Sequence, residues 1–376
     1  SVVDKVLRTM RMLLHPEAGT LIPFPSVKTT TEIMSLSGEF TECVQDTIIR
    51  CRIGDELAKH PELISIICGM LLSSNEASRD CQVDCLKILY QCTRHSPAFA
   101  KYISNHQPFA DVCYDYINST LYNANNNKGL DGIDGLALFH LLLGAVIELN
   151  PSFIIKIPKQ PMESFLRIML KAFCSDPKDA ALRKSTVLLL GTICRNHVPS
   201  CDWGQALILN YVVSGDQDHG LVDSLKRYFT EPKRESSAIR LEGSGYGFPD
   251  VGNMDGVVLL LSFLFQHPRL SFVETTSSPT ATSQAYVKDR ELWKHYIEFY
   301  RNLDPKSELS PKHLILGLQT MYEVVTQHHQ TSNILADVEF LRTVVAMLRS
   351  DFLTQVGNWP QTRYGGIHAL EGLVEC

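Results

Sequence analysis

The chain has 376 residues, of which 44% are hydrophobic and 20% are charged, with a formal net charge of −6. This composition indicates a folded protein rather than a disordered one, and the length predicts two or more domains or one extended array. The mild acidity argues against a broad nucleic-acid surface, which needs clustered Lys and Arg. The longest apolar run, 254–266, is too short to cross a membrane.

The first part of the chain alternates between amphipathic patterns and breaks. Prolines at positions 23 and 25 exclude regular helix in the connection at 21–26. An Asn- and Gly-rich segment at 123–132 predicts an exposed loop. Before and between these breaks, apolar residues at three- and four-residue spacing predict helices over 3–15, 30–52, 61–72, 76–95 and 97–118.

The same helical spacing continues to the end of the chain, and no segment shows the period-2 alternation of a strand. Helices are predicted over 133–149, 159–175, 178–197, 204–213, 219–230, 288–302, 310–329 and 333–349. The pattern therefore predicts an all-α fold.

An acid or turn residue followed by about three turns of apolar helix recurs along the chain. Helices this apolar need neighbours that cover them, and a series of them is typical of stacked helical repeats. The spacing is uneven, so a strict armadillo or HEAT period of about 40–47 residues fits only the middle of the chain. The phrase appears at 132–149, 180–197, 254–267 and 311–325.

We therefore expect an irregular armadillo/HEAT-like α-solenoid, built as one array or as two lobes. The division we predict is an N-terminal lobe at 1–230, an insertion or linker at 231–253 and a C-terminal lobe at 254–376 with a mobile Ser/Thr-rich loop at 271–289. Insertions of this kind fall in the loops of a solenoid and often contribute to its binding surface.

Eleven cysteines, an odd number placed mostly within apolar helices, indicate free thiols and a reducing compartment. Cys81, Cys85 and Cys92 share one helix face and are interpreted as core. The alternative to a scaffold is a helical metal-binding or enzymatic domain around Cys194, His197 and Cys201, with Cys174 as a fourth ligand. Their spacing lacks the paired motifs of structural zinc sites, so core packing is favoured.

No catalytic motif is present. The glycines at 243–247 lack the preceding strand and the lysine of a phosphate-binding loop, and no hydrolase or kinase signature occurs. Asp131, Asp134 and Asp255 precede apolar helices and are interpreted as helix caps. We assign no catalytic residue, no cofactor-binding residue, no metal ligand and no cofactor.

Aromatic residues near the two insertions are the candidates for binding a protein partner. Trp and Tyr anchor many protein interfaces, although packing in the core is the favoured alternative. The candidates are Tyr246, Phe248, Trp293, Tyr296 and Tyr300.

The stretch GYGFPDVGNMDGVVLLL at 245–261 resembles the C-terminal regulatory region of the Fused family of serine/threonine kinases. Tyr246, Phe248, Pro249, Gly252, Asp255 and Gly256, followed by an apolar helix, carry the resemblance, with an echo in GGIHALEGL near the end. It implies a kinase domain upstream. Separately, the chain starts without Met and stops within a helical pattern, so we expect it to be a fragment of a longer protein.

The resemblance implies partners such as a kinesin-like scaffold or Suppressor of Fused, in Hedgehog signalling or in ciliary assembly. The sequence thus predicts a non-catalytic protein-interaction scaffold in the cytoplasm or the cilium, and it leaves the oligomeric state open.

Overall fold

The computed structural model describes residues 51–72, 79–126, 130, 135–175, 180–196, 202–213, 220–230, 251–266, 290–301, 313, 316, 317 and 320. About 89% of the described residues are helical and none of them lies in a strand. The described part of the chain is therefore all-α, as the apolar periodicity predicts. The predicted helices at 3–15 and 333–349 and the predicted loop at 271–289 lie outside it.

The chain divides into two compact units. Unit 1 comprises 1–169, 196–203 and 240–247, and unit 2 comprises 170–195, 204–239 and 248–376. Residues 170–195, which the sequence analysis assigned to the N-terminal lobe, thus group with the C-terminal part. Nearly all of the predicted linker at 231–253 lies outside the described residues, so its role stays a prediction.

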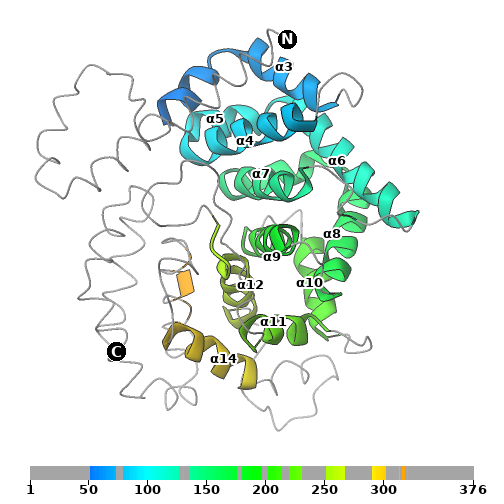
Figure 1. The fold of residues 1–376 in the computed structure, drawn as a ribbon, viewed down its shortest axis with the longest axis vertical. Coiled ribbons are helices and arrows are strands. Elements are labelled where there is room, and N and C mark those ends of the chain that lie inside the picture. Colours follow the sequence, from blue (N-terminus) through cyan, green and yellow to red (C-terminus); the bar gives the residue numbers. More distant parts are fainter. Residues whose placement is uncertain are drawn as a thin grey trace, which may run out of the picture. The chain divides into compact units, whose positions relative to one another are not determined.

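Unit 1 is built from helices that bury their apolar faces on one another. α3 packs against α6, and α4 packs against α7 (Figure 1). On α3, the buried residues Ile64, Ile67, Cys68 and Leu71 recur at helical spacing, which explains why this face turns inward. The helices are α3 (Pro61–Leu72), α4 (Arg79–His95), α5 (Pro97–Ile103), α6 (Gln107–Asn125), α7 (Leu136–Leu149), the 3-10 helix η4 (Pro151–Lys156) and the start of α8 (Lys159–Cys174).

Ser96 controls the turn between α4 and α5. Its hydroxyl oxygen accepts the backbone N–H of Phe99 at 3.0 Å, which caps α5, and its hydroxyl group donates to the Asp55 carboxylate at 2.5 Å. Pro97 occupies the first turn, where its missing N–H costs nothing. The predicted helix at 97–118 is two helices, because the chain bends at 104–106 before α6 begins.

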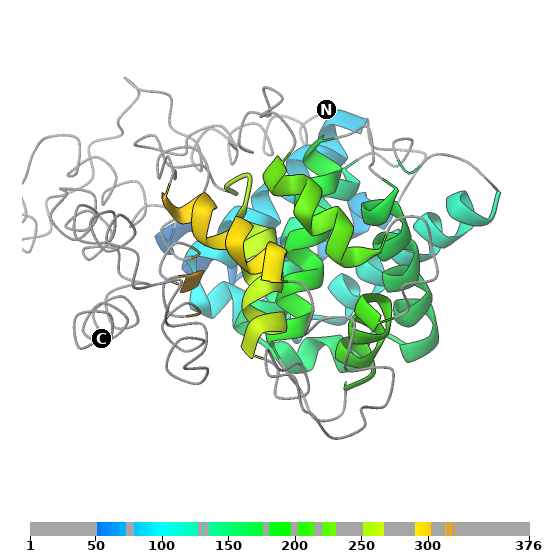
Figure 2. The same ribbon diagram turned by 90° about the horizontal axis from the view of Figure 1, so that it is seen from below.

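Unit 2 shows the same kind of packing. α9 packs against α12, and α11 packs against α14 (Figure 2). Residues 313, 316, 317 and 320 are helical and buried, and their spacing places them on one face. The helices are α9 (Ala180–Arg195), α10 (Asp202–Val213), α11 (Leu221–Thr230), α12 (Asp255–Gln266) and α14 (Arg290–Arg301).

Two glycines bring the backbones of α9 and α12 together. A Cβ on Gly191 would lie 3.0 Å from the Leu260 nitrogen, and a Cβ on Gly256 would overlap the Leu188 nitrogen. Because each glycine faces the backbone of the other helix, neither neighbour can move aside as a flexible side chain would.

We predict that Gly256→Ala lowers the free energy of unfolding by about 1–3 kcal/mol or more, because the new methyl group forces α9 and α12 apart. The matched control is Gly69→Ala on α3, where a Cβ would meet nothing within 4 Å. The control should be neutral or stabilising by up to about 1 kcal/mol, since alanine favours helix. Urea denaturation followed by circular dichroism measures both, and equal effects would contradict the close contact.

Candidate functional site

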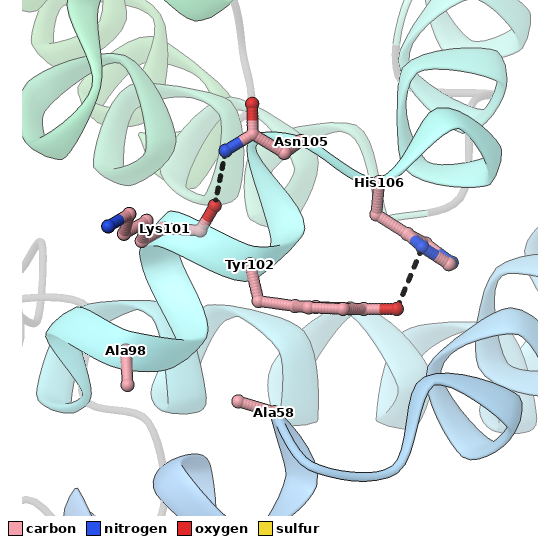
Figure 3. A pocket seen from close by; sticks show the side chains of 6 residues that line it. All are labelled: Ala58, Ala98, Lys101, Tyr102, Asn105 and His106. Carbon is pink, nitrogen blue, oxygen red and sulfur yellow. Dashed lines mark hydrogen bonds between the residues drawn. The ribbon is translucent and has the colours of Figure 1, made fainter.

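An open pocket of about 420 Å³ lies in unit 1 beside α5 (Figure 3). Ala98, Lys101, Tyr102 and Asn105 share one face of α5 and its C-terminal turn, because they recur at three- and four-residue spacing. Ala58 adds a methyl group from the turn that follows the helical residues 51–57. The lining residues are Ala58, Ala98, Lys101, Tyr102, Asn105 and His106.

A series of hydrogen bonds holds His106, which forms one wall of the pocket. The Ser65 hydroxyl donates to the Pro61 carbonyl oxygen at 2.9 Å, so its oxygen accepts from Nε2–H of His106 at 3.2 Å. Nδ1 of His106 then carries no proton and accepts the Tyr102 hydroxyl at 3.0 Å (Figure 3). This order of donors assigns the Nε2–H tautomer of a neutral histidine.

Burial favours the same protonation states. Desolvation lowers the pKa of His106 below its usual 6.5 and raises the pKa of Tyr102 above its usual 10.0, with smaller contributions to the latter from Cys68 and Glu62. At neutral pH the imidazole is therefore uncharged and the phenol keeps its proton.

One lysine, Lys101, lines the pocket, and a second, Lys156, bonds to the lining residue Asn105. The Asn105 side chain donates from Nδ2 to the Lys101 carbonyl oxygen at 2.9 Å, and its Oδ1 accepts from Nζ of Lys156 at 3.0 Å. Lys156 also donates to the Ser104 carbonyl oxygen at 2.7 Å. The arrangement combines a small apolar floor with positive charge at the rim, which suits binding of a group that carries both an anion and an aliphatic stem.

Sequence reasoning missed this pocket. The wall formed by His106 depends on its contact with Ser65, which is far away in the chain, and no local sequence pattern predicts such a contact. The one local signal was the spacing of Ala98, Lys101, Tyr102 and Asn105 along a single helix face.

The aromatic residues that we predicted to bind a partner are not among the described residues that line this pocket. Tyr296 and Tyr300 are buried, 0% and 1% exposed, so the structure fits their core-packing alternative rather than direct contact with a partner. Trp293 lies in α14, but its side chain is outside the described part of the structure, as are Tyr246 and Phe248 altogether.

The two tyrosines belong to a buried polar cluster in unit 2. Their hydroxyls donate to backbone carbonyls, Tyr296 to Gly317 at 3.4 Å and Tyr300 to His313 at 3.5 Å. A Cβ at Gly317 would overlap the Tyr300 hydroxyl, so this position requires glycine.

α12 contributes two residues, seven positions apart, to the same cluster. Asp255 approaches His313 at 3.3 Å, and the Thr320 hydroxyl donates to Ser262 at 2.7 Å. Asp255 also accepts the Gly252 N–H at 2.8 Å, so its carboxylate closes the turn before α12. The signal available in the sequence was a polar pair, Ser262 and Thr320, within otherwise apolar runs.

The cysteines of the alternative metal site are only partly described. Cys174 and Cys194 are buried, while His197 and Cys201 lie outside the described residues, as do the glycines at 243–247. Within the described ranges, no group of three or more His, Cys, Asp or Glu is arranged to hold a metal ion. Cys81, Cys85 and Cys92 are buried, as expected for core.

No family model, no curated protein and no solved structure matches this chain. Among the described residues, no helix is both long and apolar enough to span a bilayer.

We predict that iodoacetamide at pH 8 labels Cys51 well before the buried cysteines. Cys51 is partly exposed, whereas burial raises the pKa of Cys68 to about 12 and limits access to it. Mass spectrometry of the native protein over time measures the order of modification. Labelling of Cys194 as fast as Cys51 would show that this thiol is accessible and activated.

A second prediction concerns His140 on α7, which is buried against Phe165 with ring centroids 5.7 Å apart. Burial lowers its pKa to about 3, against about 6.5 in the unfolded chain. Between these values the unfolded chain binds the extra proton, so the free energy of unfolding falls as the pH falls, by up to about 1.4 kcal/mol per pH unit. His140→Leu should flatten this slope in urea titrations from pH 7 to pH 5, and an unchanged slope would contradict the assignment.

Proposed function

We propose that this chain is a non-catalytic scaffold that binds protein partners on the surface of stacked helices. The observation that carries the proposal is the set of large apolar side chains exposed in unit 1. Among the described residues, all such side chains fall between 63 and 155: Leu63, Ile66, Leu72, Tyr114, Tyr122, Leu149 and Ile155. A contiguous exposed apolar patch is typical of a protein-interaction site, and two of these residues, Leu63 and Ile66, lie one turn apart on α3.

α3 supplies the clearest part of this surface. Leu63 is 38% exposed and Ile66 is 53% exposed, although the opposite face of the same helix is buried in unit 1. They lie one turn apart, so they form a continuous apolar stripe, which we call the α3 stripe. An apolar stripe of this kind can receive the apolar face of a partner helix.

The packing order of the helices supports an armadillo/HEAT-like solenoid. α3 packs on α6 and α4 on α7, and likewise α9 packs on α12 and α11 on α14. In stacked helical pairs, each helix packs on its counterpart in the next pair. The stretches between counterparts differ in length, which explains the uneven period of the apolar phrase.

The finer assignment is to the regulatory region of a Fused-like kinase, in the cytoplasm or the cilium. The resemblance at 245–261 supports it, and the described residues of that stretch have packing roles: Asp255 closes the turn before α12, and Gly256 meets α9. Suppressor of Fused or a kinesin-like scaffold would then be the partner.

We predict that Ile66→Glu weakens partner binding at least about tenfold, because a carboxylate in the α3 stripe must be desolvated when a partner covers it. The control is Gln160→Glu, which adds the same charge at an exposed position of α8. Both variants should keep the melting temperature of the parent chain, because both positions are exposed.

The measurement is biolayer interferometry with purified Suppressor of Fused, together with quantitative cross-linking of captured proteins. If the parent chain and Ile66→Glu bind every captured protein equally well, the α3 stripe is not a binding surface. Failure of Suppressor of Fused alone would remove only the Fused-like assignment.

A further inference from the structure

The pocket beside α5 has uncompensated positive charge. In the part of the chain that the structure describes, the Lys101 ammonium forms neither a hydrogen bond nor an ion pair. Lys156 donates only to neutral oxygens, those of Ser104 and Asn105. The carboxylate of Glu62, whose charge reaches Tyr102, contacts Nδ1 of His60 at 3.2 Å and does not line the pocket.

The other polar groups of the pocket already have internal partners. Both ring nitrogens of His106 are engaged, by Tyr102 and Ser65, and the Tyr102 hydroxyl proton is directed at the imidazole. The group best placed to bind a ligand is therefore the Lys101 ammonium, which has three N–H donors and carries a full charge. Such a group selects an anion over a neutral polar ligand.

The apolar part of the pocket restricts the ligand further. The methyl groups of Ala58 and Ala98 line the pocket together with Tyr102 (Figure 3), and they offer contact to an aliphatic chain. A bare inorganic anion would leave this apolar area uncovered.

We propose that the pocket binds an acidic side chain of a partner protein segment, with an adjacent aliphatic residue of that segment on the apolar floor. The carboxylate pairs with Lys101 and lies within the field of Lys156, while the aliphatic side chain covers Ala58 and Ala98. This inference rests on the proposed scaffold function and names the chemistry that one of its sites recognises.

The test uses the full chain and fluorescence anisotropy with two fluorescein-labelled peptides, Glu-Leu-Glu-Leu-Glu and Gln-Leu-Gln-Leu-Gln, both acetylated and amidated. The acidic peptide should bind at least about fivefold more tightly. Lys101→Glu should weaken its binding about tenfold, because attraction becomes repulsion. The control Lys159→Glu, at an exposed lysine of α8, should change it less than about twofold.

A second variant fills the pocket instead of changing its rim. Ala98→Glu places a carboxylate in the pocket near the N-terminus of α5, where acidic residues favour the helix. It should therefore fold normally and abolish binding of the acidic peptide. Melting curves of all variants check folding.

Three results would overturn the proposal: equal binding of both peptides, equal losses with Lys101→Glu and Lys159→Glu, or equal binding of a Glu-Ser-Glu-Ser-Glu peptide that inorganic phosphate displaces. The last result would indicate a simple anion site. If the acidic peptide fails to bind while Ile66→Glu still weakens partner capture, this inference falls and the scaffold function stands. If both tests fail, both are contradicted.

Discussion

The organisation of unit 2 depends on the backbone contact between α9 and α12 at Gly191 and Gly256. At each glycine a Cβ would meet backbone atoms of the other helix, and backbone atoms cannot move aside by changing rotamer. α12 then carries Asp255 and Ser262, each at hydrogen-bonding distance from one residue of the 313–320 face. The glycine contact therefore fixes the position of the helix that supplies two residues of the buried polar cluster.

Unit 1 achieves order by different means. The start of α5 is fixed by the Ser96 side chain, which also bonds Asp55, and one wall of the pocket is fixed by the hydrogen bonds from Tyr102 through His106 to Ser65. Directional hydrogen bonds between partly buried side chains specify one arrangement among several apolar alternatives. The unit that is held by these directional contacts is also the one that exposes large apolar side chains among the described residues. A protein-binding scaffold needs both features: helices held in a fixed arrangement and apolar side chains exposed on their surface.

The sequence was sufficient to predict most of the helices, but it did not predict the α5 pocket or the buried polar contacts. Apolar periodicity predicted the helices at 133–149, 178–197 and 288–302, and each appears within a few residues of its predicted bounds, because burying an apolar stripe is a local requirement. It missed the bend at 104–106, where Pro108 was the only warning. The α5 pocket and the Asp255–His313 contact depend on residues brought together by packing, which periodicity does not encode. Tyr296 and Tyr300 were chosen for their chemistry, yet it is their neighbours that place them in the core.

The hydrogen bonds from Tyr102 through His106 to Ser65 also restrict the rotation of α3. Ser65 lies between Leu63 and Ile66 in the sequence, and its contact with His106 fixes how α3 is turned about its own axis. A rotation that swung the α3 stripe inward would break the chain that ends at the Pro61 carbonyl. A partner would thus meet an apolar edge already facing outward, and little of the free energy of association would go into orienting it.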